Sequence, residues 1–435
     1  MARKNLVVSI VLFINITIFF PCAAAEMLNI SQGPALELAR EKEMMMALAL
    51  QEAQINFTQR EHAWEKEKNP PEKIKKKGPV QLGGYLKNLY TNSKTTDTKA
   101  SYFTDLSRLR LDLKVKPSEE ILTNIVFDQE MLAHDFGDSS DFQAIRKNDQ
   151  KNLAFIDAEK AYCNDRNFYA KYSLYRGYIK YDNQSLQATL GKQLVDWGRC
   201  RFWSPLDLFN PVNPLSIERD ERLGTDAANL ELALGSLANL NFVYAPQQSW
   251  AKSSFGSRLY YRVENWDLFL LGGDFKNDAV VGFCADGYLG NGGLRMEFSY
   301  TDADSGKNFA RAVIGGEYNF TNKVHVLAEY FYNGGADDSN ISEFMSSYKY
   351  SSKVLTLKKN LLGSWLGYEI TPLLKWDNYM IYDFDQKGVF FNPEFKYNLW
   401  ANFDVSAGAQ LFWGNHKSEF GDYQNVYYAQ AQYFF

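Results

Sequence analysis

The stretch YQNVYYAQAQYFF, residues 423–435, decides the fold class of this chain. In a β-strand, side chains alternate between two faces. One face here carries Tyr427, Ala429, Ala431, Tyr433 and Phe435, and the other carries Tyr428, Gln430, Gln432 and Phe434. One face therefore suits hydrocarbon and the other suits a polar interior, which is typical of a transmembrane β-barrel strand. The alternative is an amphipathic edge strand of a soluble sheet.

The N-terminus has the pattern of a secretory signal peptide. Arg3 and Lys4 precede an uncharged run over residues 6–20, and three alanines end at Ala25. We expect cleavage after Ala25, so that residues 1–25 form the signal peptide. Cys22 leaves a lipoprotein as an alternative, but bulky residues stand where a lipobox needs small ones.

The overall composition also favours a barrel. Aromatic residues make up 15% of the chain although its mean hydropathy is only −0.37. Barrel strands place half their residues in lipid and gather rings at the interfaces, although a soluble β-sandwich or propeller would share this composition. A net charge of −5 argues against a nucleic-acid partner. The four histidines are scattered and no CxxC motif is present, so we expect no metal and no cofactor.

Residues 26–78 differ from the rest and predict a periplasmic helical arm followed by a basic linker. Leu38, Met45, Leu48 and Ile55 keep a rough 3.5-residue spacing. The arm is either a solvated helix or a coiled coil that would hold a homotrimer. Pro70 and Pro71 end it before a lysine-rich linker.

Residues 79–435 read as a transmembrane antiparallel β-barrel of about 18 strands, with 16 as the rival count. Over residues 107–115, Leu109, Leu111 and Leu113 alternate with Arg108, Arg110 and Lys114. Short connections, such as 117–119 and 182–184, alternate with long ones near 135–168, 195–227 and 334–353. This asymmetry predicts periplasmic turns, longer outer loops and both termini in the periplasm.

The densest motif is GKQLVDWGRCRFWSPLDLFNP, residues 191–211. Its GKQ, then Trp197 with Gly198, then Asn210 with Pro211, resemble the signature of porin-like bacterial outer-membrane barrels, including alginate-export-like and related uncharacterised families. Lys192 replaces the more usual arginine, and the helical arm is not part of that pattern. The C-terminal Tyr433 and Phe435 similarly resemble the assembly signal of Gram-negative outer-membrane proteins. These resemblances imply an outer-membrane location, contact with lipid, and the barrel assembly machinery as a partner.

The loop that follows Trp197 and Gly198 is too long and too polar to be a simple hairpin turn. A loop that folds inward narrows a pore and presents its side chains to passing solutes. The expected constriction residues are Asp196, Trp197, Gly198, Arg199, Arg201 and Asp207. The alternative is a loop that packs on itself above the barrel.

Two groups of charged residues are expected to face each other across the lumen. The basic wall comprises Arg108, Arg110, Lys114, Arg176 and Lys180, and the acidic wall comprises Glu329, Glu369, Glu394 and Asp404. Opposed walls would orient polar solutes. Alternatively, the charges form local cross-strand pairs, such as Arg295 with Glu317.

The sequence thus predicts a channel for passive diffusion of small polar or anionic solutes, and not an enzyme. An export barrel for a polysaccharide, a barrel that sheathes another envelope protein, and a closed barrel tethered to the cell wall remain alternatives. If a disulfide forms, Cys163 with Cys200 is the preferred pair, because both fall in predicted outer loops.

Overall fold

The computed structural model describes residues 78–94, 100–135, 155–156, 158–219, 221–222, 224–320, 323–336, 353–416 and 418–435. The predicted signal peptide and almost all of the predicted arm and linker, residues 1–77, lie outside the described residues. No helix among the described residues is long and apolar enough to span a membrane.

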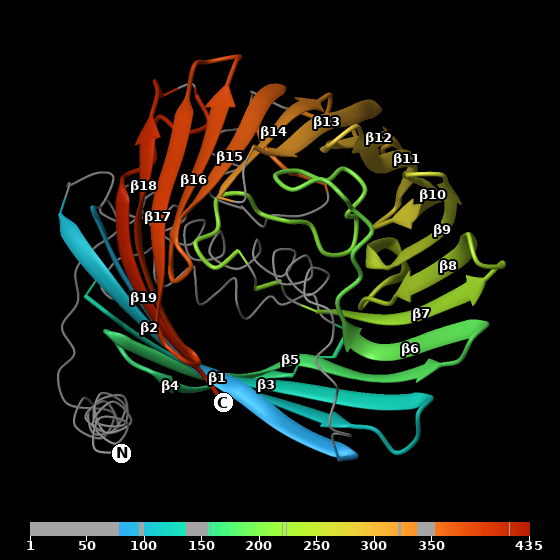
Figure 1. The fold of residues 1–435 in the computed structure, drawn as a ribbon, viewed down its shortest axis with the longest axis horizontal. Coiled ribbons are helices and arrows are strands. Elements are labelled where there is room, and N and C mark those ends of the chain that lie inside the picture. The colour runs from blue at the N-terminus through green and yellow to red at the C-terminus, as the bar shows by residue number, and fades with distance from the viewer. Residues whose placement is uncertain are drawn as a thin grey trace.

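The described strands form one antiparallel sheet that closes on itself, because β1 pairs with both β2 and β19 (Figure 1). The strands are β1 (Val80–Lys94), β2 (Ser101–Val115), β3 (Ile121–His134), β4 (Glu159–Asn164), β5 (Phe168–Asp182), β6 (Leu186–Gln193), β7 (Thr225–Ala233), β8 (Ala238–Ala245), β9 (Ser254–Val263), β10 (Trp266–Phe275), β11 (Asp278–Leu289), β12 (Gly292–Asp302), β13 (Phe309–Asn319), β14 (Val324–Asn333), β15 (Asn360–Thr371), β16 (Leu374–Asp383), β17 (Val389–Trp400), β18 (Phe403–Trp413) and β19 (Val426–Phe434).

Eighteen of these strands form the continuous wall, which confirms the predicted all-β barrel and its strand count. The extra strand is β4, which pairs with residues 169–173 along one edge of β5, while β3 pairs with the other edge of β5. The 16-strand alternative is wrong.

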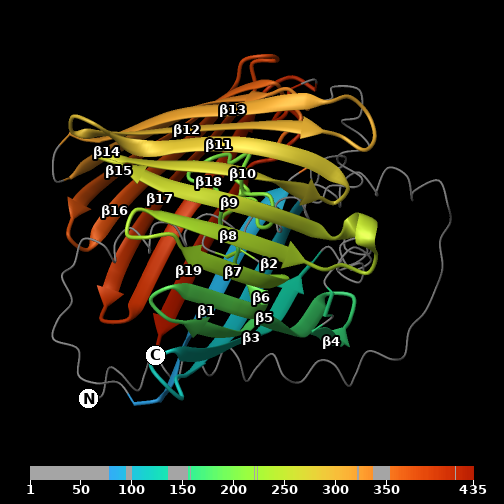
Figure 2. The same ribbon diagram turned by 90° about the vertical axis from the view of Figure 1, so that its right-hand side faces the viewer.

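The connections alternate in length as the sequence predicts. The turn 116–120 is short, and Lys116 donates its backbone N–H to the carbonyl of Pro79, so β1 begins at the end of the barrel that carries the short turns. The long connection 194–224 lies at the other end. The connection 276–277, between β10 and β11, is an exception to the alternation, because it is a two-residue turn at the long-loop end. Figure 2 shows the tilted strands from the side, with the 3₁₀-helix Trp250–Lys252 at one end.

The alternation of side chains explains why these segments form a barrel wall. On β2, Arg108 and Arg110 are buried inside, whereas Leu109 and Leu111 point outward. Large apolar side chains elsewhere on the outer surface are exposed, such as Leu270 (59%), Val281 (56%) and Ile314 (50%). An outer surface of this kind suits hydrocarbon rather than water.

The interior of the barrel contains a hydrophobic core. Phe331 on β14 and Phe390 on β17 belong to one cluster with Cys200, Phe202 and Trp203, which come from the connection between β6 and β7. A chain segment therefore packs inside the barrel and supplies apolar surface that the inward faces of the strands bury.

Candidate constriction site

The inner loop, residues 194–224 between β6 and β7, enters the barrel instead of packing above it. In Figure 1 it is the green to yellow-green segment that runs within the ring of strands. Trp197, Trp203 and Leu206 are at most 2% exposed. The inward interpretation of this loop is therefore the one that the structure shows.

The first half of the inner loop, residues 194–209, is held by two carboxylates of the wall. Glu297 on β12 accepts the backbone N–H groups of Arg199 and Cys200, the latter at 2.8 Å, and the hydroxyl of Ser204 at 2.6 Å. Glu329 on β14 accepts the N–H groups of Arg201 and Phe202 at 2.6 and 2.7 Å. Hydrogen bonds to a charged acceptor contribute about 1.5 to 3 kcal/mol each, so this half is firmly attached.

Glycines in the wall make room for large side chains of the first half. A Cβ at Gly363 would lie 2.5 Å from the ring of Phe202, and a Cβ at Gly282 would lie 2.4 Å from the side chain of Leu206. These distances are far below van der Waals contact. The loop is therefore packed directly onto the backbone of β15 and β11.

The Trp197–Gly198 and Asn210–Pro211 pairs of the sequence motif stabilise the fold of the first half of the inner loop. A Cβ at Gly198 would lie 1.9 Å from Oγ of Ser204, so only glycine allows this close approach. Trp197 is buried and donates its indole N–H to Asn241 on β8 at 2.9 Å. Asn210 accepts the N–H of Val195 at 2.9 Å. The motif therefore closes the loop on itself and against the wall.

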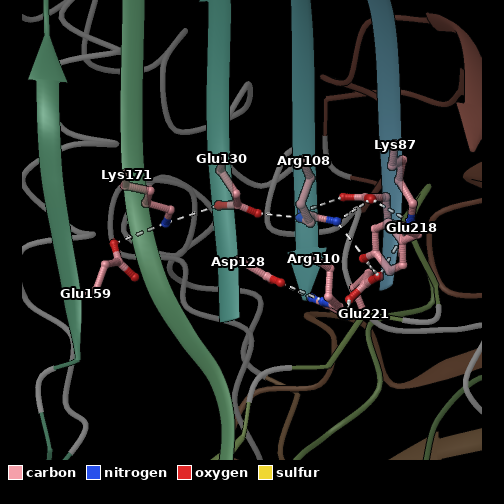
Figure 3. Close-up of polar contacts among 10 residues, drawn as sticks. Lys87, Arg108, Arg110, Asp128, Glu130, Glu159, Lys171, Glu218 and Glu221 are labelled. Carbon is pink, nitrogen blue, oxygen red and sulfur yellow. Dashed lines mark hydrogen bonds and ion pairs between the residues drawn. The ribbon is translucent and has the colours of Figure 1, made fainter. Parts of the chain in front are cut away.

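The second half of the inner loop, residues 210–224, is held by ion pairs (Figure 3). Glu218 pairs with Arg108 at 2.6 Å and with Lys87 on β1 at 3.0 Å. Glu221 pairs with Arg110 at 2.6 Å and with Lys87 at 3.5 Å. All five residues are at most 8% exposed.

The wall also supplies acids to the same arginines. Glu130 and Asp128 both lie on β3. Arg108 donates to Glu130 at 2.6 Å, and Arg110 donates to Asp128 at 2.6 Å. Lys171 on β5 continues the row toward Glu130 at 3.7 Å and Glu159 at 3.1 Å. Each cation that holds the loop therefore bridges a loop carboxylate and another acid.

The charges around Glu218 and Glu221 determine their protonation. Burial alone would raise the pKa of Glu221, but Arg110, Lys87 and Arg108 together hold that pKa well below its usual range. Burial also opposes ionisation of Glu218, and Arg108 and Lys87 again lower its pKa. Both loop carboxylates are therefore ionised at neutral pH.

Two further contacts hold the second half against the far side of the barrel. Arg219 lies over the ring of Tyr379 on β16, 3.1 Å from the ring centroid. Gln410 on β18 donates to the carbonyl of Leu215 at 2.6 Å. The loop thus contacts inward faces from β1 to β18.

The expected constriction residues lie along the inner loop but differ in exposure. Asp196 and Arg199 are exposed and Arg201 is half-buried, whereas Trp197, Gly198 and Asp207 are buried. Asp207 pairs with Arg222 at 2.6 Å, and Arg222 also contacts Asp196 at 2.9 Å. Arg199 and Arg201 are therefore the cations of this set that reach the lumen.

The residues of the expected basic wall all have nearby partners. Arg108 and Arg110 are buried beneath the inner loop, and Arg176 is buried beside the carbonyl groups of Arg222 and Tyr175. Lys114 pairs with Asp112 at 3.0 Å, and Lys180 pairs with Asp182 at 3.0 Å.

The residues of the expected acidic wall likewise have nearby partners. Glu329 holds the inner loop, Glu394 lies 3.5 Å from Lys396, and Glu369 lies 3.8 Å from Lys375. Asp404 accepts a hydrogen bond from Asn398 at 2.6 Å. Arg295 and Glu317 form the expected cross-strand pair at 2.7 Å. Local pairing therefore dominates the lumen charges.

An arginine pair that the sequence reasoning did not foresee lies beside the first half of the loop. The guanidinium carbons of Arg199 and Arg258 on β9 lie 4.7 and 5.1 Å from the ring centroid of Phe269 on β10. Neither forms an ion pair within 4 Å among the described residues. Arg258 comes from a strand remote in sequence, so no local motif could have indicated the pair.

The C-terminal residues close the barrel. Phe435 and Gly84 exchange backbone hydrogen bonds at 3.0 Å in both directions, and Tyr433 pairs with Leu86. The segment that resembles an assembly signal is thus also the last part of the β1–β19 seam.

The predicted Cys163–Cys200 disulfide is wrong. Cys200 is a buried thiol in the inner loop, and burial raises its pKa. The prediction assumed an outer loop, but the inner loop carries Cys200 into the barrel.

No protein-family model matches the sequence, and no curated protein matches it. Solved structures of similar fold include Pseudomonas aeruginosa OccK7 (OpdD), with a TM-score of 0.53 and 10% identity, covering 82% of this chain and 99% of that chain. A BenF-like porin from Pseudomonas fluorescens Pf-5 gives 0.53 and 11%, covering 82% and 98%. Pseudomonas aeruginosa OpdK with vanillate gives 0.51 and 10%, also covering 82% and 98%. At these identities the likeness establishes the fold alone.

Proposed function

We propose that this protein is an outer-membrane channel through which small polar and anionic solutes diffuse passively, with the inner loop as its constriction. The porin-like fold and the apolar outer surface support the location. The inner loop supports the channel function, because a segment anchored inside a barrel narrows the lumen and so limits the size of the solutes that pass.

The observation that carries the preference for anions is the Arg199–Arg258 pair. Two guanidinium groups beside one ring create a positive region that, among the described residues, has no carboxylate within ion-pair distance. A partly dehydrated anion can bind such a pair bidentately. By contrast, Arg262 on the same strand is neutralised by Asp267 at 2.7 Å.

The envelope context is part of this proposal. We place the signal peptide at residues 1–25, the periplasmic arm at 26–78 and the barrel at 79–435, with lipid and the barrel assembly machinery as partners. The arm would allow a homotrimer. A loop anchored across the lumen favours small solutes over passage of a polysaccharide.

The test is the current through the purified protein in a planar bilayer, with the reversal potential measured in a salt gradient. We expect conductance and anion selectivity, and we expect the double variant R199Q/R258Q to lose most of that selectivity. R262Q is the matched control, because it removes an inward arginine that already has an acidic partner. A protein that does not conduct, or variants that behave alike, would contradict the proposal.

A further inference from the structure

We infer that Glu297 and Glu329 are positioning residues for ion selectivity. Although both are negative, they make the channel more selective for anions, because they hold the backbone that carries Arg199. The inference rests on the proposed function. It concerns which residues place the Arg199 guanidinium in the lumen.

Glu297 and Glu329 bind an unbroken run of backbone N–H groups of the loop. Four consecutive N–H groups, from Arg199 to Phe202, donate to just two carboxylates. Glu297 additionally accepts the Ser204 hydroxyl and, at 3.4 Å, the N–H of Leu206. Glu297 and Glu329 are 2% and 1% exposed. Their oxygens therefore face loop amides and not the solution in the lumen.

This capture fixes the direction of the arginine side chains. The backbone of Arg199 is held at β12, and its guanidinium group reaches back over Phe269 on β10, where Arg258 also lies. The two like charges repel each other. Without a fixed backbone, we expect Arg199 to move away from Arg258 and the paired cationic site to disperse.

The sign of the effect distinguishes positioning from simple electrostatics. Removing a negative charge from a channel wall ordinarily raises selectivity for anions. Removing the charge of Glu297 should instead lower it, because glutamine cannot accept all the hydrogen bonds that Glu297 accepts. In glutamine an NH₂ group replaces one of the two carboxylate oxygens. Its N–H groups can only donate, and they would face the N–H and O–H donors of the loop.

The experiment measures reversal potentials for E297Q, E329Q and D377N. Asp377 on β16 is the matched control: it is a buried inward carboxylate that pairs with Lys396 at 3.3 Å and bonds Trp365 at 3.1 Å. We expect the ratio of anion to cation permeability to fall severalfold in E297Q and E329Q, and to rise slightly in D377N. A rise in all three variants would overturn the inference.

A fourth variant weakens the attachment of the loop to Glu297 but leaves the charge of Glu297 in place. S204A deletes one hydrogen bond to Glu297, and we expect a smaller fall in anion selectivity with normal assembly, judged by heat-modifiable migration on gels. If S204A keeps wild-type selectivity while E297Q fails to assemble, the positioning role is wrong. If the wild-type channel itself does not conduct or is not selective for anions, the proposed function fails, which is a separate outcome.

Discussion

The two halves of the inner loop are attached to the same barrel by opposite chemistry. In the first half the wall supplies the anions, Glu297 and Glu329, and the loop supplies backbone N–H groups. In the second half the loop supplies the anions, Glu218 and Glu221, and the wall supplies cations. Backbone donors do not titrate and cannot be removed by substitution. Changes to the loop's own side chains can therefore release the second half, whereas the first half can be released only by changes to the wall carboxylates.

The largest effect should follow from replacing Glu218 and Glu221 together by alanine. This leaves Lys87, Arg108 and Arg110 buried without their loop partners, and breaking a buried ion pair costs about 3 to 5 kcal/mol. We expect the second half to become sensitive to limited proteolysis and the channel current to become noisier. E369A, which removes an exposed partner of Lys375, is the control and should have little effect.

Acid should reproduce the release of the second half. The pKa of Glu221 is depressed in the folded protein, so its contribution to stability is present above the ordinary carboxyl range and is lost as the pH falls through the depressed value. Loop proteolysis should therefore stay low at pH 5 and rise only in strongly acidic solution. A release that begins near pH 6 would contradict the assigned ion pairs.

A smaller effect is expected where the first half packs on the wall. G363V places side-chain atoms where the Phe202 ring lies, and overpacking of this kind costs about 1 to 3 kcal/mol. The hydrogen bonds to Glu297 should keep the neighbouring residues attached, so we expect altered tryptophan fluorescence from Trp203 with little proteolysis. Extensive proteolysis at this half would show that packing, and not amide capture, holds it.

The smallest effect should appear at the long-loop end of the barrel, where a carboxyl responds to pH in the opposite direction. Glu419, between β18 and β19, bonds Thr356 and lies near Asp383 and Lys358; burial, together with Asp383, raises its pKa to about 7. A raised pKa stabilises the packed segment at low pH, and this contribution is lost as the pH rises through about 7.

Hydrogen exchange over residues 414–425 should therefore quicken between pH 5 and pH 7 beyond the ordinary base catalysis. Between the ordinary carboxyl pKa and this raised pKa, each pH unit weakens the packed state by at most about 1.4 kcal/mol, and above the raised pKa the loss levels off. E419Q should abolish this excess, whereas T356V, which removes one hydrogen bond worth about 1 kcal/mol, should quicken exchange at both values. An E419Q variant that keeps the pH dependence would exclude Glu419 as its source.

The fold was readable from the sequence because a barrel strand is a local pattern. Alternation at residues 107–115 and 423–435 determines which side chains face lipid, and connection lengths determine which end of the barrel carries the short turns. The GKQ, Trp-Gly and Asn-Pro motif likewise marked the inner loop. Its contacts were not readable, because Glu297 and Glu329 have the same alternating context as any inward residue.

The sequence by itself determined an antiparallel barrel of about eighteen strands and the long segment after the Trp-Gly motif, because these follow from a two-residue period and from local turn residues. It left open whether that segment enters the barrel. Only the tertiary structure decided that Arg108 and Arg110 hold the loop, that Cys200 is a buried thiol, and that Arg258 joins Arg199. Each of these depends on which residues from distant strands meet inside a closed cylinder. That meeting is set by the register with which the strands pair around the barrel and by the path of one long loop, and neither has a local signature.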